Sequence, residues 1–245
     1  MIREPAADGQ SRRALALVAA RNEEGRVGAA VRSLLDRGCI DRVVVVDDGS
    51  SDETAGEASL AGARVLRLGR NRGKGGALSA ALGRLVADGD LAAEETVCFV
   101  DGDTAATAGR VGDLVEAVVA GRADMAIAVL PRPAHGGGFG LVLGLARWGV
   151  RRVTGRRLDA PLSGQRALNA DTLRAVLPLE RGFALEVGMD IDALRAGLRV
   201  VEVEVPMEHA VTGRDLRGFA HRARQGADIM WVLASRALRR SRSQR

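Results

Sequence analysis

The sequence has no tyrosine, and aromatic residues make up only 2% of its 245 residues. Because 47% of the residues are hydrophobic, the core must be filled by valine, leucine, alanine and isoleucine. The two cysteines, Cys39 and Cys98, cannot form a framework of disulfides, which argues against a small secreted scaffold and favours a reducing cytoplasm. Cys98 lies inside an apolar run, so we interpret it as a small buried residue.

The sequence also lacks an apolar run that could span a bilayer, and it lacks a signal-peptide hydrophobic region. The longest apolar stretch runs from Phe139 to Val150 and is broken by Arg147, whereas a spanning helix needs about 20 apolar residues. We therefore expect a cytoplasmic protein that is either soluble or peripheral at the inner face of the membrane.

The formal net charge is only +5, and basic and acidic residues are interspersed along most of the chain. A nucleic-acid-binding protein usually carries a basic stripe or a recognisable motif, so we expect no nucleic-acid partner. The exception is the C-terminus, which holds Arg236, Arg239, Arg240, Arg242 and Arg245. This segment can be a solvated tail, or it can contact an anionic membrane surface.

Apolar runs alternate with amphipathic segments, which predicts an α/β fold with a mainly parallel sheet covered on both faces. We expect strands at residues 14–20, 43–46, 64–68, 96–100, 123–129 and 199–205. We expect helices at residues 26–36, 52–61, 77–86, 111–120, 139–153 and 215–238, and a mobile loop at 131–138. The length fits one large domain over residues 14–212, between a flexible lead (1–13) and an amphipathic helix with a basic tail (213–245).

Acidic residues follow two of the expected strands. Asp101-Gly102-Asp103 follows strand 96–100, and Asp47-Asp48 follows strand 43–46. Open α/β sheets bind their ligands at the carboxyl ends of strands. Two carboxylates one residue apart repel each other unless a divalent cation neutralises them, and such a cation also binds phosphate oxygens. The sequence therefore predicts a metal and phosphate site at this edge.

The only lysine of the chain, Lys74, lies in the glycine-rich segment Gly73-Lys74-Gly75-Gly76. Backbone N–H groups and the helix dipole at such a turn favour anions, so a compact positive charge here suits a diphosphate. The spacing of a P-loop is missing.

Asp48 can accept a hydrogen bond from a ring N–H of uracil or guanine. The alternative for Asp47 and Asp48 is turn and helix-capping chemistry.

Together with Ala20-Arg21-Asn22-Glu23-Glu24, these segments resemble the family 2 glycosyltransferases with the GT-A fold, a Rossmann-like three-layer sandwich. The resemblance runs from about Leu15 to Val205 and includes the polyprenyl-phosphate sugar synthases. It implies metal-dependent transfer of a sugar from a UDP- or GDP-sugar, with a nucleotide-binding half (14–104) and an acceptor half (105–212). Nucleotide-sugar contacts would come from Ala20, Arg21, Glu23, Asp48, Lys74, Asp101 and Gly102.

The resemblance also implies a metal site. Asp101 would contact the ribose, and Asp103, counted as catalytic, would coordinate a Mg²⁺ or Mn²⁺ ion that bridges the donor diphosphate. His209 follows an expected strand and would be a second metal ligand, because a neutral imidazole suits these ions in mixed ligation. His135 and His221 have no partner that the sequence reveals, so we interpret them as surface residues.

The acceptor side carries fewer signals. Glu186 and Asp190 lie four residues apart on an expected helix, so they share a face, and either could be a general base. Residues 151–209 also resemble the glucosyl-3-phosphoglycerate synthases, in which Arg151, Thr154 and Arg166 would face a small anionic acceptor; Arg214 is a further candidate. The chain is shorter than those enzymes and lacks their long N-terminal extension, so retention and inversion both stay open.

The main prediction is transfer to a polyprenyl phosphate or another membrane-associated acceptor, because residues 139–150 are apolar and the last helix is basic. The alternative is a small phosphorylated acid such as 3-phosphoglycerate. A nucleotidyltransferase would carry a glycine-rich N-terminal signature, and a non-catalytic nucleotide-binding module would tend to lose the metal ligands, so both are disfavoured. A homodimer is one assembly that we consider.

Overall fold

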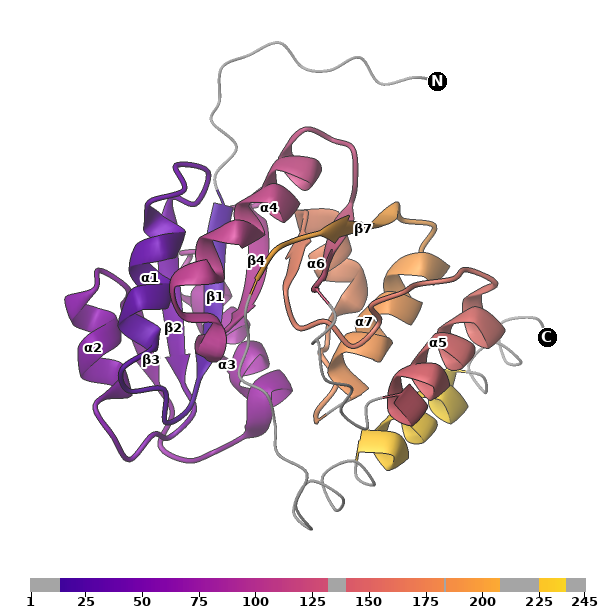
Figure 1. The fold of residues 1–245 in the computed structure, drawn as a ribbon, viewed down its shortest axis with the longest axis horizontal. Helices are drawn as coiled ribbons and strands as arrows, with labels where there is room; N and C mark the ends of the chain where they lie inside the picture. Colours follow the sequence, from indigo (N-terminus) through magenta and orange to yellow (C-terminus); the bar gives the residue numbers. More distant parts are fainter. Residues whose placement is uncertain (1–13, 132–139, 183, 208–224, 237–245) are drawn as a thin grey trace.

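The structure is a computed structural model that describes residues 14–131, 140–182, 184–207 and 225–236 (Figure 1). Within these residues, one sheet has the strand order β3-β2-β1-β4-β6-β5-β7. All neighbouring strands are parallel except β6, which is antiparallel to both β4 and β5. The strands are β1 (Ala14–Ala20), β2 (Arg42–Asp47), β3 (Arg64–Arg67), β4 (Thr96–Asp101), β5 (Met125–Val129), β6 (Arg166–Leu168) and β7 (Val200–Glu204). The predicted α/β class with a mainly parallel sheet is confirmed.

Helices connect the strands. They are α1 (Val27–Leu35), α2 (Thr54–Leu60), α3 (Gly73–Ala87), the 3-10 segment η1 (Gly102–Val111), α4 (Gly112–Val119), α5 (Gly140–Thr154), α6 (Ala170–Val176) and α7 (Ala184–Arg195). Residues 225–236 are also helical, and we call them the terminal helix. In Figure 1 the terminal helix lies beside α5.

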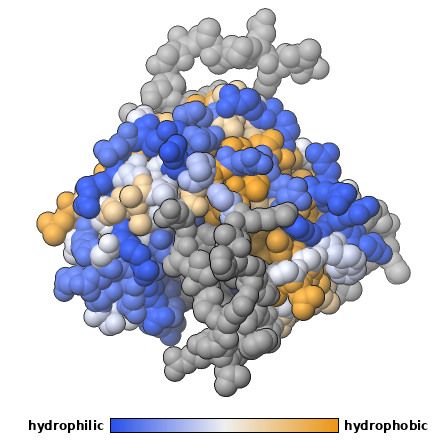
Figure 2. Space-filling model, in the orientation of Figure 1, coloured by the Kyte–Doolittle hydropathy of each residue, from blue (hydrophilic) through white to orange (hydrophobic). Residues whose placement is uncertain are grey.

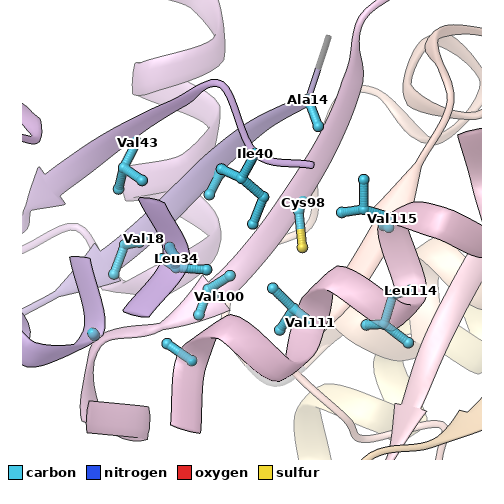
Figure 3. Close-up of a cluster of buried hydrophobic side chains, with 14 of the residues drawn as sticks. Ala14, Val18, Leu34, Ile40, Val43, Cys98, Val100, Val111, Leu114 and Val115 are labelled. Carbon is cyan, nitrogen blue, oxygen red and sulfur yellow. The ribbon is translucent and has the colours of Figure 1, made fainter. Parts of the chain in front are cut away.

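The sheet separates two hydrophobic cores, so the fold has three layers. Alternate side chains of β1 point to opposite faces: Val18 belongs to one core together with Leu34 of α1 and Leu114 of α4 (Figure 3). Leu17 belongs to the other core, which is completed by apolar residues of α3, α5, α6, α7 and the terminal helix. This alternation is the period-2 pattern of a strand buried on both faces.

The structure differs from the predicted elements in three places. α3 begins at Gly73 rather than at residue 77, so Lys74 lies in its first turn. Glycine weakens a helix, and the prediction therefore missed this glycine-rich turn. Helix α4 is preceded by the long 3-10 segment η1. Neither β6 nor α6 was predicted. β6 gives a weak sequence pattern, because it is only 3 residues long and begins with an arginine.

Several predictions fall on residues outside the described part. These are the lead 1–13, nearly all of the loop 131–138, and the residues His135, His209, Arg214 and His221. Of the predicted helix 215–238, the described part is helical over residues 225–236. Among the described residues, no helix combines the length and the apolar character needed to cross a membrane.

Most of the visible surface is hydrophilic, but hydrophobic residues gather where α5 and the terminal helix lie, at the lower right of Figure 2. Leu141 and Trp148 of α5 are 89% and 58% exposed, and Met230 and Trp231 of the terminal helix are 49% and 61% exposed. Their neighbours Ala146 and Ile229 have no exposed surface and belong to the core. Each helix is therefore apolar on its outer side as well as on its inner side.

Candidate active site

Three ionisable side chains from distant parts of the chain meet at the carboxyl-terminal edge of the sheet. Lys74 lies in the first turn of α3, Asp101 ends β4, and Glu186 lies in the first turn of α7. Lys74 Nζ is 2.5 Å from Asp101 Oδ1 and 3.2 Å from Glu186 Oε1. The side chains of Lys74, Asp101 and Glu186 are 25%, 33% and 11% exposed, so the cluster remains open to a ligand.

The charges of this cluster depend on one another. Burial lowers the pKa of the Lys74 ammonium, but the nearby carboxylates of Asp101 and Glu186 outweigh burial and raise that pKa above its ordinary value. Lys74 therefore stays protonated at neutral pH. With one cation between two carboxylates, the ammonium can exchange a carboxylate for a phosphate oxygen when an anionic ligand enters.

Two residues that were not predicted as site residues complete this cluster. Gln165 Nε2 donates to Asp101 Oδ2 over 2.9 Å, and Gln165 Oε1 accepts from the Asp101 backbone N–H over 3.0 Å. Gly164 lies so close that a Cβ atom at this position would overlap both Asp101 Oδ2 and Lys74 Nζ. Both residues lie in the predicted acceptor half (105–212), and their sequence pattern does not reveal that they face Asp101.

Asp48 holds the beginning of α3. The Asp48 carboxylate is 5% exposed, and it accepts hydrogen bonds from the backbone N–H groups of Arg72 (2.7 Å) and Gly73 (2.8 Å). This is the helix-capping role that stood as the alternative to base recognition, and the remaining lone pairs of the carboxylate would have to accept from a base. Asp47 accepts from the Ser50 backbone N–H over 2.8 Å, which is turn chemistry.

The segment after β1 is fastened to the segment after β2. Asn22 has a left-handed φ of 56°, and its side chain accepts from the Ser51 backbone N–H over 3.0 Å. The Glu23 backbone N–H donates to Thr54 Oγ1 over 2.8 Å. Arg21 is exposed to solvent at the start of this segment.

Gly102 brings Ala20 and Glu23 together. A Cβ atom on Gly102 would lie 3.0 Å from Ala20 Cβ and 3.1 Å from Glu23 Cγ, closer than most real Cβ contacts. Three of the predicted nucleotide-sugar contacts therefore pack against one another, and a glycine is needed at position 102 for them to do so.

Asp103 lies next to this group, in an acidic environment. Burial raises the pKa of the Glu23 carboxyl, Arg26 offsets part of this effect, and the negative charge of Asp103 raises that pKa further. Carboxylate oxygens are ligands that Mg²⁺ and Mn²⁺ accept, so the chemistry of Asp103 fits the predicted metal. Among the described residues, no group of three or more His, Cys, Asp or Glu side chains could hold an ion, and the second predicted ligand, His209, lies outside them.

The backbone just after Asp103 is strained. Ala105 has φ 44° and ψ −134°, a conformation that a residue with a Cβ rarely adopts and that costs about 1–3 kcal/mol. Neighbouring hydrogen bonds hold it in place: Thr104 Oγ1 donates to the Asp101 carbonyl (2.8 Å), and Ser33 Oγ donates to the Ala106 carbonyl (2.6 Å). Such enforced strain is common in segments that position functional groups.

Arg166 and Asp190 have no exposed side-chain surface for a ligand, in contrast to the predictions that Arg166 contacts the acceptor and that Asp190 could be a base. Both side chains are 0% exposed and they form an ion pair with each other. Burial raises the pKa of Asp190 to about 6, although Arg166 lowers it. The i, i+4 spacing correctly placed Glu186 and Asp190 on one helix, but only Glu186 reaches the cluster.

The other predicted acceptor contacts are not brought into the cluster. Arg151 is exposed near the end of α5, and Thr154 ends that helix, with its Oγ1 donating to the Val150 carbonyl over 2.7 Å. Arg214 lies outside the described residues.

Comparisons with known proteins identify the family and the fold. Residues 16–155, more than half of the chain, match the family model described as glycosyl transferase family 2. A comparison with curated protein sequences finds no match.

Solved structures of glucosyl-3-phosphoglycerate synthase from Mycobacterium tuberculosis share the fold. The complex with phosphoglyceric acid is 27% identical, has a TM-score of 0.72, and aligns over 92% of this chain and 80% of that chain. The complex with Mn²⁺, UDP and phosphoglyceric acid is 25% identical, with a TM-score of 0.71 and coverage of 92% and 78%. The complex with Mn²⁺, UDP and glucosyl-3-phosphoglycerate is 25% identical, with a TM-score of 0.72 and coverage of 96% and 86%. The predicted GT-A fold is therefore confirmed.

Proposed function

Because the chain belongs to glycosyl transferase family 2 and is a glycosyltransferase, we propose that it moves a sugar from a UDP-sugar to a small phosphorylated carboxylic acid such as 3-phosphoglycerate. The observation that carries the proposal is the Lys74, Asp101 and Glu186 cluster at the carboxyl edge of the sheet. The similar structures contain UDP, Mn²⁺ and phosphoglyceric acid, which supports this alternative over the polyprenyl phosphate of the main prediction.

On the donor side, Lys74 would contact the diphosphate and Asp101 the ribose. Asp48 would act in two ways: it holds the first turn of α3, and with it Lys74, and its remaining lone pairs would accept a hydrogen bond from the base. Ala20, Arg21, Glu23 and Gly102 would line the nucleoside, which is supported by the contact of Gly102 with Ala20 and Glu23.

Asp103 and His209 would hold a Mn²⁺ or Mg²⁺ ion. Bound there, such an ion neutralises negative charge on the leaving nucleoside diphosphate. The negative charge of Asp103 raises the pKa of the nearby Glu23 carboxyl, and this concentration of negative charge supports a cation at this position.

On the acceptor side, Glu186 would be the carboxylate that meets the acceptor hydroxyl, since Asp190 has no exposed surface. Arg151, Thr154 and Arg214 would contact the anionic groups of the acceptor, and this remains a proposal from sequence. A phosphorylated acid suits arginines, because the guanidinium group matches carboxylate and phosphate in geometry.

The first test is sugar transfer from UDP-glucose and from GDP-glucose to 3-phosphoglycerate in the presence of Mn²⁺. We expect UDP-dependent product, and we expect Asp103→Ala to lower turnover roughly 100-fold or more, as the loss of a metal ligand does at such sites. The matched control is Asp88→Ala, which removes an exposed carboxylate at the end of α3 and should leave turnover unchanged. Wild-type activity of Asp103→Ala that also resists a chelator would contradict the proposed role of Asp103.

A membrane-associated polyprenyl phosphate is retained as a second candidate acceptor because of the exposed apolar residues on α5 and the terminal helix. Apolar area next to arginines supports binding at a bilayer surface. Flotation with vesicles of anionic phospholipid separates the candidates. Binding together with transfer to a polyprenyl phosphate would support the membrane acceptor, and transfer to 3-phosphoglycerate without vesicle binding would support the soluble one.

A further inference from the structure

Arg166 and Asp190 form a fully buried ion pair directly behind the candidate site. Among the described residues, Arg166 is the largest of the side chains that are fully buried. Removing two charges from water is costly, and such pairs are often no more stabilising than apolar residues of the same volume. The ion pair therefore needs an explanation beyond stability.

The remaining donors of Arg166 bind the backbone of the segment that precedes β6. Arg166 Nε donates to the Ser163 carbonyl over 2.8 Å, and Arg166 Nη2 donates to the Pro161 carbonyl over 3.2 Å. Its third nitrogen, Nη1, is bonded to Asp190 of α7. The planar guanidinium group thus fixes two backbone carbonyls and one carboxylate in a single geometry, which a lysine could not do.

The segment held in this way carries the two residues that touch the site. Gln165 pairs with both the backbone and the side chain of Asp101, and Gly164 packs against Asp101 and Lys74. The other end of the segment cannot slip, because β6 is paired on both sides, with Arg166 opposite Phe99 of β4 and Ile127 of β5. Asp190 is also one helical turn from Glu186, the third member of the cluster.

We infer that Arg166 and Asp190 are positioning residues, which hold segment 161–165 so that Gln165 and Gly164 fix Asp101 and Lys74 for the donor nucleotide. The inference rests on the proposed donor site. It assigns the pair a function through Gln165 rather than through contact with the acceptor or the reacting atoms.

The main test replaces the whole pair, in the double variant Arg166→Met/Asp190→Leu. Because apolar residues of similar volume often substitute for a buried ion pair without loss of stability, the double variant should fold. The double variant loses the hydrogen bonds to Ser163 and Pro161 that hold segment 161–165. We therefore expect the dissociation constant for UDP with Mn²⁺ to rise roughly tenfold, a change of the size that the loss of one strong hydrogen bond produces. The KM for UDP-glucose should rise with it, and kcat should change less.

A second variant, Arg166→Lys, keeps the charge pair and guards against a double variant that fails to fold. It loses the planar guanidinium group and its hydrogen bonds to two backbone carbonyls, so UDP binding should again weaken while the melting temperature stays close to that of the wild type. Gln165→Ala should weaken UDP binding to a similar extent. Combining Gln165→Ala with the double variant should add little, because all three changes act on one contact.

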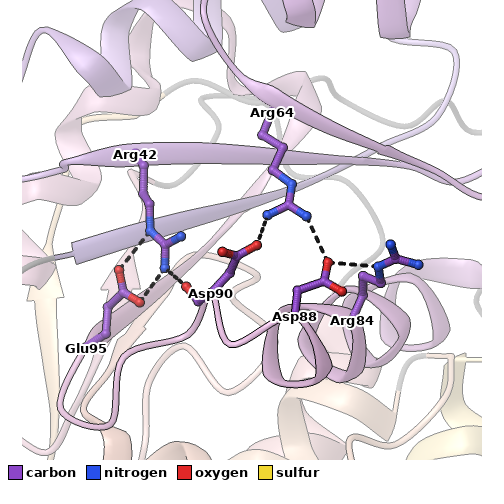
Figure 4. A network of polar contacts seen from close by, with 6 residues as sticks. All are labelled: Arg42, Arg64, Arg84, Asp88, Asp90 and Glu95. Carbon is purple, nitrogen blue, oxygen red and sulfur yellow. Dashed lines mark hydrogen bonds and ion pairs between the residues drawn. The ribbon is translucent and has the colours of Figure 1, made fainter.

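The control pair is Arg42 and Glu95 (Figure 4). Arg42 is the first residue of β2, so the pair lies at the amino-terminal ends of the parallel strands, away from the candidate site at their carboxyl ends. Glu95 is buried, and Arg42 bonds both to Glu95 and to the Asp90 carbonyl, much as Arg166 does with its partners. Arg42→Met/Glu95→Leu should leave the affinity for UDP unchanged.

Unchanged UDP affinity in a folded Arg166→Met/Asp190→Leu, or full additivity with Gln165→Ala, would overturn the inference. Failure of the proposed function is distinguishable, since in that case the wild-type protein itself would not bind UDP. A crystal structure of the double variant provides a readout independent of activity, in which Gln165 should no longer pair with Asp101.

Discussion

Gly164 shows at the scale of one residue how tightly the candidate site is packed. Nothing in its backbone requires glycine, because it does not have a left-handed φ. Space requires it, since a Cβ would overlap the Lys74 ammonium and the Asp101 carboxylate, whose separation is 2.5 Å. We therefore predict that Gly164→Ala pushes these two groups apart and raises the dissociation constant for UDP with Mn²⁺, measured by calorimetry.

The matched control is Gly83→Ala, in the middle of α3, where a Cβ would meet nothing within 4 Å. Alanine stabilises a helix interior by about 0.5–1 kcal/mol relative to glycine, so Gly83→Ala should raise the melting temperature and leave UDP binding unchanged. Equal UDP affinities for both variants would show that the space around Gly164 is not limiting.

At this scale the sequence predicted the residues whose chemistry is unusual. Asp101 and Lys74 stood out because paired carboxylates after a strand and a single lysine have few structural explanations, and the structure places them in contact. The contact between Arg166 and Asp190 could not be predicted. The spacing of Glu186 and Asp190 along a helix shows that they share a face, but it does not show which residues pack against that face. No sequence motif indicated that Gln165 contacts the candidate site.

At the scale of elements, Asp124 joins the antiparallel strand to its neighbours. Its carboxylate accepts from the Arg199 backbone N–H (2.7 Å), from the Arg199 guanidinium (3.0 and 3.1 Å) and from Asn169 Nδ2 (3.1 Å). Hydrogen bonds from the Arg199 side chain, and then from its backbone, lower the pKa of Asp124 although partial burial raises it. This network ties the beginnings of β5 and β7 to the end of β6.

We predict that Asp124→Asn lowers the melting temperature at pH 7. A depressed pKa in the folded state means that the carboxylate contributes stability above its unfolded pKa, near 3.8, and that this contribution is lost as pH falls through the folded pKa. The difference between wild type and variant should therefore shrink below about pH 4. A difference in melting temperature that does not change between pH 7 and pH 3 would contradict this assignment.

The predicted element boundaries are most accurate where the local sequence pattern is strong. Strands β1, β2 and β4 are long apolar runs and were predicted to within about one residue. The first turn of α3 was missed because its stability comes from the distant Asp48 carboxylate rather than from its own glycines. β6 was missed because its pairing with β4 and β5 is entirely tertiary.

At the scale of the molecule, the terminal helix is fastened to the body by a buried arginine. Arg236 is 4% exposed and forms ion pairs with Glu180 and with Asp192 of α7. Leu233 packs so closely on Gly149 that α5 has no room for a Cβ there. Glu180 in turn lies against Gly75, next to Lys74. The terminal helix therefore supports the wall of the candidate site.

We predict that Arg236→Gln lowers stability by about 2 kcal/mol, because the two partly buried carboxylates of Glu180 and Asp192 lose their partner. Thermal unfolding measures this, and limited proteolysis should cut within residues 225–236 earlier than in the wild type. Arg84→Gln is the control, since Arg84 is 67% exposed and its pair with Asp88 lies at the surface (Figure 4). A melting temperature for Arg236→Gln equal to that of Arg84→Gln would rule out an anchoring role.

The reversed direction of β6 has a consequence for the order in which the site forms. Asp101 and Gln165 are 64 residues apart in sequence, and Lys74 and Glu186 are 112 apart. A nascent chain that has emerged only as far as the first residues of η1 already contains Asp48, Lys74, Asp101 and Asp103, but the side of β4 that pairs with β6 is still unpaired, and Asp101 lacks its amide partner Gln165. The candidate site is thus completed by the half of the chain that is synthesised last, and an interrupted product would carry Asp48, Lys74, Asp101 and Asp103 without the contacts that Gln165 and Glu186 provide.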